Sequence, residues 1–291
     1  MIFSDQIMER VMIDLSEKKV VSQAEELRIL IQSLIDILDS VGTVDVKKKH
    51  RIYISTFIRK IVYHSLSLHH LSKGSILNTK QKDVIIIDAS TCFIVTRALI
   101  ETYITFNHMY IQPKTEEEQF FRFKLWEISG FIPRQTLNPL HGTTYKDEEK
   151  ATIDKLKIAL ESDPFYETLS RDQKKRLDKY GLPRILGWKE LIKECGFDDK
   201  IVNGYSHFSQ YTHSDYFAMQ QVKYDNYRID VFDRPDRQDI NLCLRLAQVF
   251  ISKSINDVVD LIPECKKTYD KLPILIAAKI KFLSSLHDEN K

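Results

Sequence analysis

The segment from about residue 83 to about residue 111 is apolar on nearly every side when it is drawn as a helix. Because a helix of this kind has to be surrounded by other helices, it is expected to lie at the centre of a bundle. Its apolar residues are Val84, Ile85, Ile86, Ile87, Phe93, Ile94, Val95, Leu99, Ile100, Ile104, Phe106 and Met109. The 8 Gly and 8 Pro among 291 residues are well below average usage, which disfavours turn-rich β-sandwiches. The sequence therefore predicts an all-α fold built around this segment.

Segments with helical periodicity on both sides of 83–111 supply the other helices of a single multi-helix bundle. We expect one all-helical domain over residues 1–291. Its expected parts are an N-terminal helical hairpin over 22–73, a core with the polar motifs over 83–221, a small irregular or hairpin insert near 223–239, and C-terminal helices over 239–286. Within the core, residues 131–145 contain two prolines and a glycine and are predicted to form a loop.

The balance of charge and the cysteine pattern limit the binding partners and the cellular compartment that we expect. The 43 Lys+Arg and 41 Asp+Glu leave a net charge of +2, so binding of nucleic acid or anionic lipid requires a local patch. The four cysteines form no Cys-x-x-Cys pair and are interpreted as buried thiols in a reducing compartment. Residues 1–21 are too charged for a secretory signal, and no apolar run reaches the ~20 residues of a membrane span. A cytoplasmic protein that does not bind membranes is expected.

The sequence contains no pattern for a metal or a cofactor site. His64 and His69 share a predicted helix but differ by roughly 140° around it, and no two histidines have the i,i+4 spacing of a helical zinc site. Phosphate-binding P-loops and Gly-x-Gly-x-x-Gly dinucleotide turns are also missing. We therefore expect no metal and no cofactor.

A polar stripe interrupts the apolar central segment. Ser90, Arg97, Glu101 and His108 fall within roughly 40° of one another on a helical wheel. Arg97 and Glu101 stand four residues apart, so their side chains can meet, and a buried arginine without a partner would be very costly. One reading is a structural ion pair that fixes the register of the helix. The other is a cleft in which Arg97 binds an anion or stabilises developing negative charge while Glu101 orients it.

A second polar cluster, residues 205–214, is rich in hydroxyl groups and contains two imidazoles. On a helix, one face of this cluster carries Ser206, Ser209, Gln210 and His213. An imidazole can act as a general acid or base near neutral pH, and His213 would have Tyr205 or Ser206 as its hydrogen-bond partner. The alternative reading is a hydrogen-bonded core histidine.

Three motifs follow one another along the chain: Arg97-x-x-x-Glu101 on a buried helix, Trp188 with Gly196, and Tyr205 followed by Ser209-x-x-x-His213. Together they resemble an uncharacterised family of helical prokaryotic proteins. The resemblance covers about residues 85–218 and implies no particular activity. It does imply that five residues approach one another in space, and these are the candidate catalytic residues: Arg97, Glu101, Tyr205, Ser209 and His213.

Residues 59–64, Arg59-Lys60-Ile61-Val62-Tyr63-His64, have the spacing of the Arg-x4-6-His motif, and the chain also resembles HEPN-type ribonucleases there. That resemblance implies that Arg59 steadies a scissile phosphate and that His64 transfers a proton.

Two functions are compatible with these patterns. The first is a metal-independent ribonuclease or toxin-like effector of a bacterial defence system, in which Arg97 holds a phosphate of RNA or of another ligand and His213 transfers a proton. The second is a non-catalytic helical bundle for protein interaction or ligand sensing, in which the Arg/Glu/His cluster is structural. A partner protein or a second copy of the chain is the expected partner in the second case.

Overall fold

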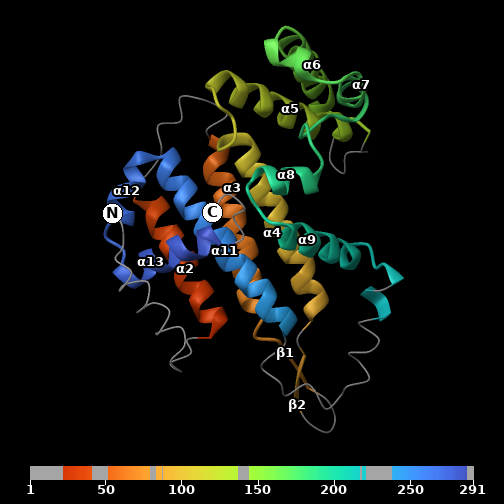
Figure 1. Ribbon diagram of the computed structural model, residues 1–291. Coiled ribbons are helices and arrows are strands. Elements are labelled where there is room, and N and C mark those ends of the chain that lie inside the picture. Colours follow the sequence, from red (N-terminus) through yellow and green to blue (C-terminus); the bar gives the residue numbers. More distant parts are fainter. Residues whose placement is uncertain are drawn as a thin grey trace. The chain divides into compact units, whose positions relative to one another are not determined.

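The computed structural model describes residues 22–40, 52–78, 83–86, 88–136, 144–216, 218–220 and 238–286. These residues are mostly helical, which confirms the all-α class (Figure 1). The insert expected near 223–239 falls outside the described residues except at its last two positions. The chain divides into two compact units, residues 1–104 with 192–291 and residues 105–191. The single domain over 1–291 stays a prediction.

The long helix α11 is the main packing partner within the first unit. The elements of this unit are α2 (Gln23–Asp39), α3 (Ile52–Leu71), strands β1 (Ser75–Asn78) and β2 (Asp83–Ile86), the larger part of α4 (Ala89–Tyr110), α9 (Asp199–Thr212), α11 (Gln238–Leu261), η4 (Pro263–Cys265), α12 (Lys266–Tyr269) and α13 (Ile274–Ser285). Helix α11 packs against α2, α3 and α13. The facing sides of α2, α3 and α11 bury apolar residues at helical spacing, including Leu27, Leu34, Ile58, Ile61 and Ile251.

Helix α4 is the buried central helix that the apolar pattern predicts, but it begins later than expected. Among its residues Ala89–Tyr110, Ile94 alone is exposed. Residues 83–86 instead form strand β2, which pairs antiparallel with β1. The run is short and rich in β-branched residues, which favour strands, and periodicity alone does not separate such a run from a buried helix. The side chain of Asp88 accepts a hydrogen bond from the backbone N–H of Thr91 (3.1 Å) and so caps the helix after the hairpin.

The second unit, residues 105–191, packs helix α5 against α6 and α7. Its elements are the end of α4, α5 (Glu116–Arg134), α6 (Thr144–Glu161), η2 (Pro164–Thr168), α7 (Arg171–Tyr180) and most of α8 (Trp188–Glu194). Its core contains Phe121, Leu125, Ile128, Leu160 and Leu177. The loop predicted over 131–145 is wrong at both ends, because α5 continues to Arg134 and α6 begins at Thr144; residues 137–143 lie outside the described part of the chain. Pro133 lies in the last turn of that helix, where it removes one backbone hydrogen bond just before the helix ends at Arg134.

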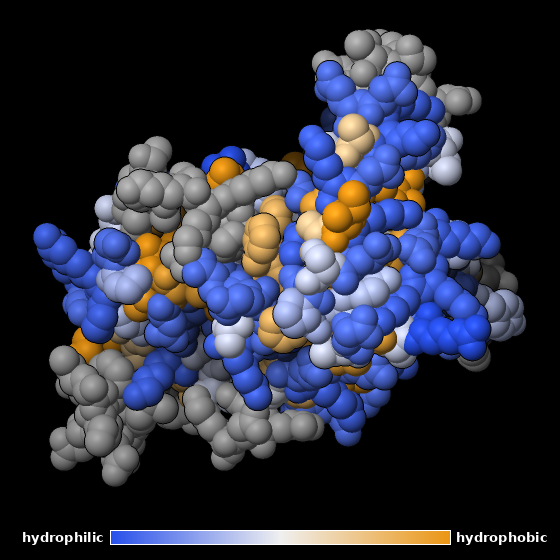
Figure 2. Space-filling model, turned by 90° about the horizontal axis from the view of Figure 1, so that it is seen from above, coloured by the Kyte–Doolittle hydropathy of each residue, from blue (hydrophilic) through white to orange (hydrophobic). Residues whose placement is uncertain are grey.

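The surface of the described residues is mostly hydrophilic on the face shown in Figure 2, and hydrophobic residues reach that face as separate patches. Among the described helices, none combines the length and the apolar character that crossing a membrane requires.

Candidate functional site

Arg97 and Glu101 form the ion pair that their spacing predicts. The Nε of Arg97 donates to Oε1 of Glu101 at 3.0 Å, and the Nη2 lies 3.0 Å from the same oxygen. The side chain of Arg97 is 17% exposed and that of Glu101 is 28% exposed. The pair therefore lies at the edge of the packed interior, where water still reaches both groups.

Tyr205 of α9 completes the network from a distant part of the sequence. Asp198 caps α9 by accepting hydrogen bonds from the backbone N–H groups of Lys200 and Ile201, which fixes where the helix starts. Tyr205 follows on its buried side, and its hydroxyl donates to Oε1 of Glu101 at 2.8 Å. The guanidinium carbon of Arg97 lies 5.5 Å from the centre of the Tyr205 ring, within the range of a cation–π contact.

The network sets the protonation of two of its members. Burial, together with the hydrogen bond to Glu101, raises the pKa of Tyr205 to about 12. Burial would lower the pKa of Arg97, but Tyr205 and Glu101 outweigh it and the pKa lies above its ordinary value. Arg97 is thus a permanent cation and Tyr205 a neutral hydroxyl donor near neutral pH.

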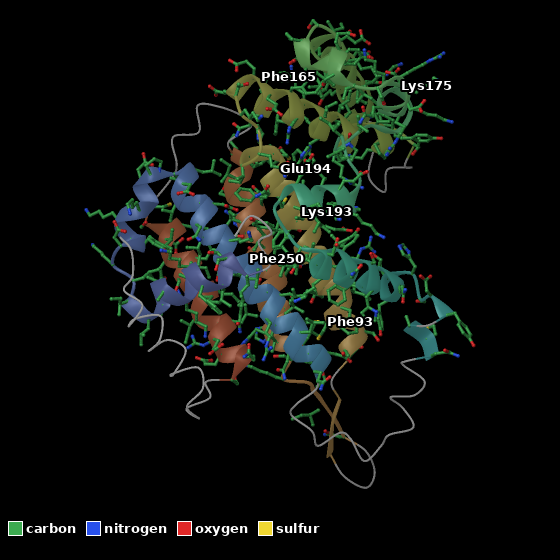
Figure 3. The ribbon with its side chains drawn as sticks, in the orientation of Figure 1. Phe93, Phe165, Lys175, Lys193, Glu194 and Phe250 are labelled. Carbon is green, nitrogen blue, oxygen red and sulfur yellow. The ribbon has the colours of Figure 1, made fainter. Side chains whose placement is uncertain are left out.

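An aromatic cluster continues the contact between α4 and α9 one turn before Arg97. Phe93 lies four residues before Arg97 on α4, and Figure 3 shows it beside α9. Its ring centre is 5.3 Å from that of His207, 5.1 Å from that of Phe208 and 4.6 Å from that of Tyr211. Rings at these distances add to the apolar burial between the two helices. The ion pair therefore lies beside a packed helix contact.

Ser209 and His213 do not join the network directly. The hydroxyl of Ser209 donates to the backbone carbonyl of Tyr205 at 2.9 Å, a bond within α9 itself. His213 is the exposed C-terminal cap residue of α9. Within the described part of the chain, His213 forms no side-chain hydrogen bond to Arg97, Glu101 or Tyr205. The structure thus brings together three of the five candidate residues, and a catalytic role for the set stays a prediction.

His108, the last member of the polar stripe, has partners of its own in the second unit. The Nη1 of Arg122 donates to Nδ1 of His108 at 2.9 Å and to its backbone carbonyl at 2.7 Å. Burial, with the nearby charge of Arg122, lowers the pKa of His108 to about 4. The imidazole is therefore neutral, and Arg122 is neutralised instead by Glu118 at 2.6 Å.

Asp257 of α11 is a titratable group of the first unit that the sequence patterns did not single out. The hydroxyl of Tyr103 on α4 donates to its Oδ2 at 2.9 Å. Phe197 and Phe250 pack against the Tyr103 ring, with ring centres 6.1 and 5.2 Å away. Burial raises the pKa of Asp257 to about 7. Asp257 and Tyr103 are 154 positions apart in the sequence, so no local motif predicts this contact.

Three of the four cysteines are buried free thiols. These are Cys92, Cys243 and Cys265, as expected, whereas Cys195 is partly exposed. Burial raises the pKa of both Cys92 and Cys243 to about 12, which keeps these thiols protonated and unreactive. Over the described residues, no group of three or more His, Cys, Asp or Glu side chains has an arrangement that could hold a metal ion.

More than half of the chain matches the model of one protein family. A model of the family of unknown function DUF5677 matches residues 53–226. The chain belongs to DUF5677. This confirms the resemblance to an uncharacterised helical family, and gives no support to the resemblance to HEPN-type ribonucleases. No curated protein and no solved structure matches the chain significantly.

The DUF5677 match contains the whole Arg97–Glu101–Tyr205 network, together with Ser209 and His213. Asp257 and the rest of α11 lie beyond it. The network between α4 and α9 is therefore a feature of the DUF5677 region, whereas the Tyr103–Asp257 contact joins that region to the C-terminal helices.

Proposed function

We propose that this chain is a non-catalytic interaction protein of the cytoplasm, in which the Arg97–Glu101–Tyr205 network joins α4 to α9. One observation carries the proposal: a single oxygen of Glu101 accepts hydrogen bonds from both Arg97 and Tyr205. This carboxylate already has a cation and a hydroxyl in place, as in a structural contact between two helices. The bundle then presents its outer surface to a partner protein, a second copy of the chain or a small ligand.

Acid–base catalysis finds little support in this geometry. The hydroxyl of Tyr205 remains protonated near neutral pH and is committed to Glu101, so it is not available as a base. His213 stands eight residues after Tyr205, which is about 12 Å further along the axis of α9. A general base has to lie within hydrogen-bond reach of the proton that it takes, directly or through one water.

A second candidate function is metal-independent cleavage of RNA by a toxin-like effector of a bacterial defence system. The partial exposure of Arg97 and Glu101 favours it, because a phosphate could approach the guanidinium from solvent. In this candidate Arg97 holds the phosphate and His213 transfers a proton. The two candidates make opposite predictions for substitutions of these two residues.

We expect Arg97→Ala to lower the free energy of unfolding by about 2 kcal/mol, because Oε1 of Glu101 then loses the guanidinium that donates to it. Tyr205→Phe should cost about 1 kcal/mol through the lost hydroxyl. Urea unfolding followed by circular dichroism measures both values. RNA incubated with the purified wild type should remain intact.

His213→Ala is the matched control, since its exposed side chain makes no contact with the network; we expect it to change stability by less than about 0.5 kcal/mol. The structural proposal fails if the wild type degrades RNA while His213→Ala and Arg97→Ala, each still folded, do not. It also fails if Arg97→Ala is as stable as the wild type.

A further inference from the structure

The outward side of helix α3 is basic and carries no carboxylate. We define the α3 outer face by its exposed residues, which are Ile52, Ser55, Thr56, Arg59, Lys60, Tyr63, Ser67 and His70. The opposite side of the helix buries residues such as Ile58, Ile61 and Leu68 and packs on α2 and α11. No Asp or Glu occurs anywhere in Ile52–Leu71. The face therefore presents cations, hydroxyls, one imidazole and one tyrosine ring to solvent, with a single exposed isoleucine at the start of the helix.

The cations of this face are not neutralised within the described part of the chain. Neither Arg59 nor Lys60 forms an ion pair with any described residue. His64 at the edge of the face adds no charge, because burial and the charge of Lys60 lower its pKa. The sequence just before the helix is basic as well, with Lys47, Lys48, Lys49 and Arg51. A polyanion would be attracted to this part of the chain although the net charge is only +2.

Tyr63 adds an exposed aromatic ring to the cations of the α3 outer face. It is 59% exposed, and it lies one turn beyond Arg59 and Lys60 on the same side of the helix. Cations that follow a phosphate backbone beside an aromatic ring on which a base can stack are the combination by which proteins bind single strands without sequence preference. From Arg59 to His70 the face is about 16 Å long, enough for a few nucleotides.

We propose that the α3 outer face binds single-stranded nucleic acid, with Arg59 and Lys60 on phosphates and Tyr63 stacked on a base. The inference goes beyond the proposed function and does not depend on the α4–α9 network. It rests on the charge and exposure of the face and includes no cleavage step. An anionic membrane would also be attracted by the cations, but the stacking position of Tyr63 favours a nucleic acid base.

Helix α7 offers a matched control in the second unit. It carries exposed Lys175 and Arg176, and Tyr180 at its end is 62% exposed. Figure 3 labels Lys175 on this helix. In contrast to α3, helix α7 also contains Asp172 and Asp178. Equivalent substitutions on the two helices therefore separate a specific face from the general effect of positive charge.

Fluorescence anisotropy of labelled oligouridine and oligothymidine of about 12 nucleotides, titrated with the full chain, tests the proposal. Binding in the micromolar range at low salt is expected. Arg59→Ala/Lys60→Ala should weaken it at least ~10-fold and make the slope of log K against log salt shallower by about 1.4. Tyr63→Ala should weaken it ~5- to 100-fold with little change of slope, and Tyr63→Phe should bind as the wild type does.

The control variants Lys175→Ala/Arg176→Ala and Tyr180→Ala should bind as the wild type does. The proposal is overturned if neither single strand binds, or if the α7 variants lose as much affinity as the α3 variants. It is equally overturned if a duplex of the same length, or vesicles containing phosphatidylserine, bind more tightly than the single strands. All substituted side chains are exposed, so circular dichroism should report an unchanged fold for every variant.

Discussion

Asp163→Ala is expected to lower the free energy of unfolding of the 105–191 unit by about 3 kcal/mol or more. The Nζ of Lys124 lies 2.6 Å from Oδ2 of Asp163, and the two side chains are only 8% and 12% exposed. Without the carboxylate, Lys124 remains buried with one backbone carbonyl, that of Ala159 at 3.3 Å, and the ring of Phe120. Removing one partner of a buried ion pair leaves an uncompensated charge, which costs far more than an exposed pair is worth.

Asp163 has a second role that the experiment has to separate. Its Oδ1 accepts a hydrogen bond from the backbone N–H of Phe165 and caps η2. Asp163→Asn can keep this cap while removing the charge, so the difference between the alanine and asparagine variants isolates the cap. The double variant Lys124→Met/Asp163→Asn contains no buried charge and should regain much of the lost stability.

The measurement is direct because both tryptophans of the chain, Trp126 and Trp188, belong to this unit. Denaturant unfolding followed by tryptophan fluorescence therefore reports on the unit that contains the ion pair. An alanine variant that unfolds at the same denaturant concentration as the wild type would show that this pair is not buried in solution.

Asp257→Asn is expected to stabilise the protein above neutral pH by about 2 to 3 kcal/mol. The ordinary pKa of 3.8 rises to about 7 in the folded state, chiefly because the carboxyl is buried. Between these two values the unfolded chain releases the proton while the folded chain keeps it. The contribution of Asp257 to stability is thus greatest below about pH 4, falls as the pH rises towards 7, and is lost above it. The residue keeps some contact with solvent, which makes the expected gain smaller than the full shift would give.

Asparagine is neutral at every pH and can still accept the hydrogen bond from Tyr103, so its variant should lose this part of the pH dependence. Unfolding by urea, followed by circular dichroism at about pH 5 and about pH 8.5, compares the two proteins. Asp239→Asn is the control, because Asp239 is exposed at the start of the same helix and does not contribute to the raised pKa of Asp257; it should leave the difference in stability between the two pH values unchanged. Wild type and Asp257→Asn with parallel pH profiles would contradict the assignment.

Much of the fold is readable from local sequence, and the exceptions have physical causes. The burial of α4 is predicted correctly, because a long helix with apolar residues on nearly every side has to be surrounded by other helices. The four residues of β2 are too few for such a pattern, and their partner strand β1 contributes the deciding hydrogen bonds from outside the segment. Pro133 favours a loop because proline breaks helices, but α5 accepts it one residue before its end, at the loss of one backbone hydrogen bond.

The candidate site also combines contacts that the sequence predicts with contacts that it does not. The Arg97–Glu101 contact follows from four-residue spacing, which is a local property of a helix. That Tyr205 reaches Glu101 came from the resemblance to a family, since the two residues are 104 positions apart. No rule of spacing could say that His213 would end α9 in solvent, because that depends on where the helix stops. Neither residue spacing nor the family resemblance predicts the Tyr103–Asp257 contact, because it depends on the packing of α11 against α4.

The place of α11 has a practical consequence for work on DUF5677 proteins. Helix α11 covers the apolar sides of α2 and α3 and receives the Tyr103 hydrogen bond, yet it begins at Gln238, after the family match ends at residue 226. A recombinant fragment trimmed to the match would expose Ile58, Ile61 and their neighbours to water and would tend to aggregate. Expression boundaries for soluble material should extend at least through Ser285, because α13 in turn packs against α11.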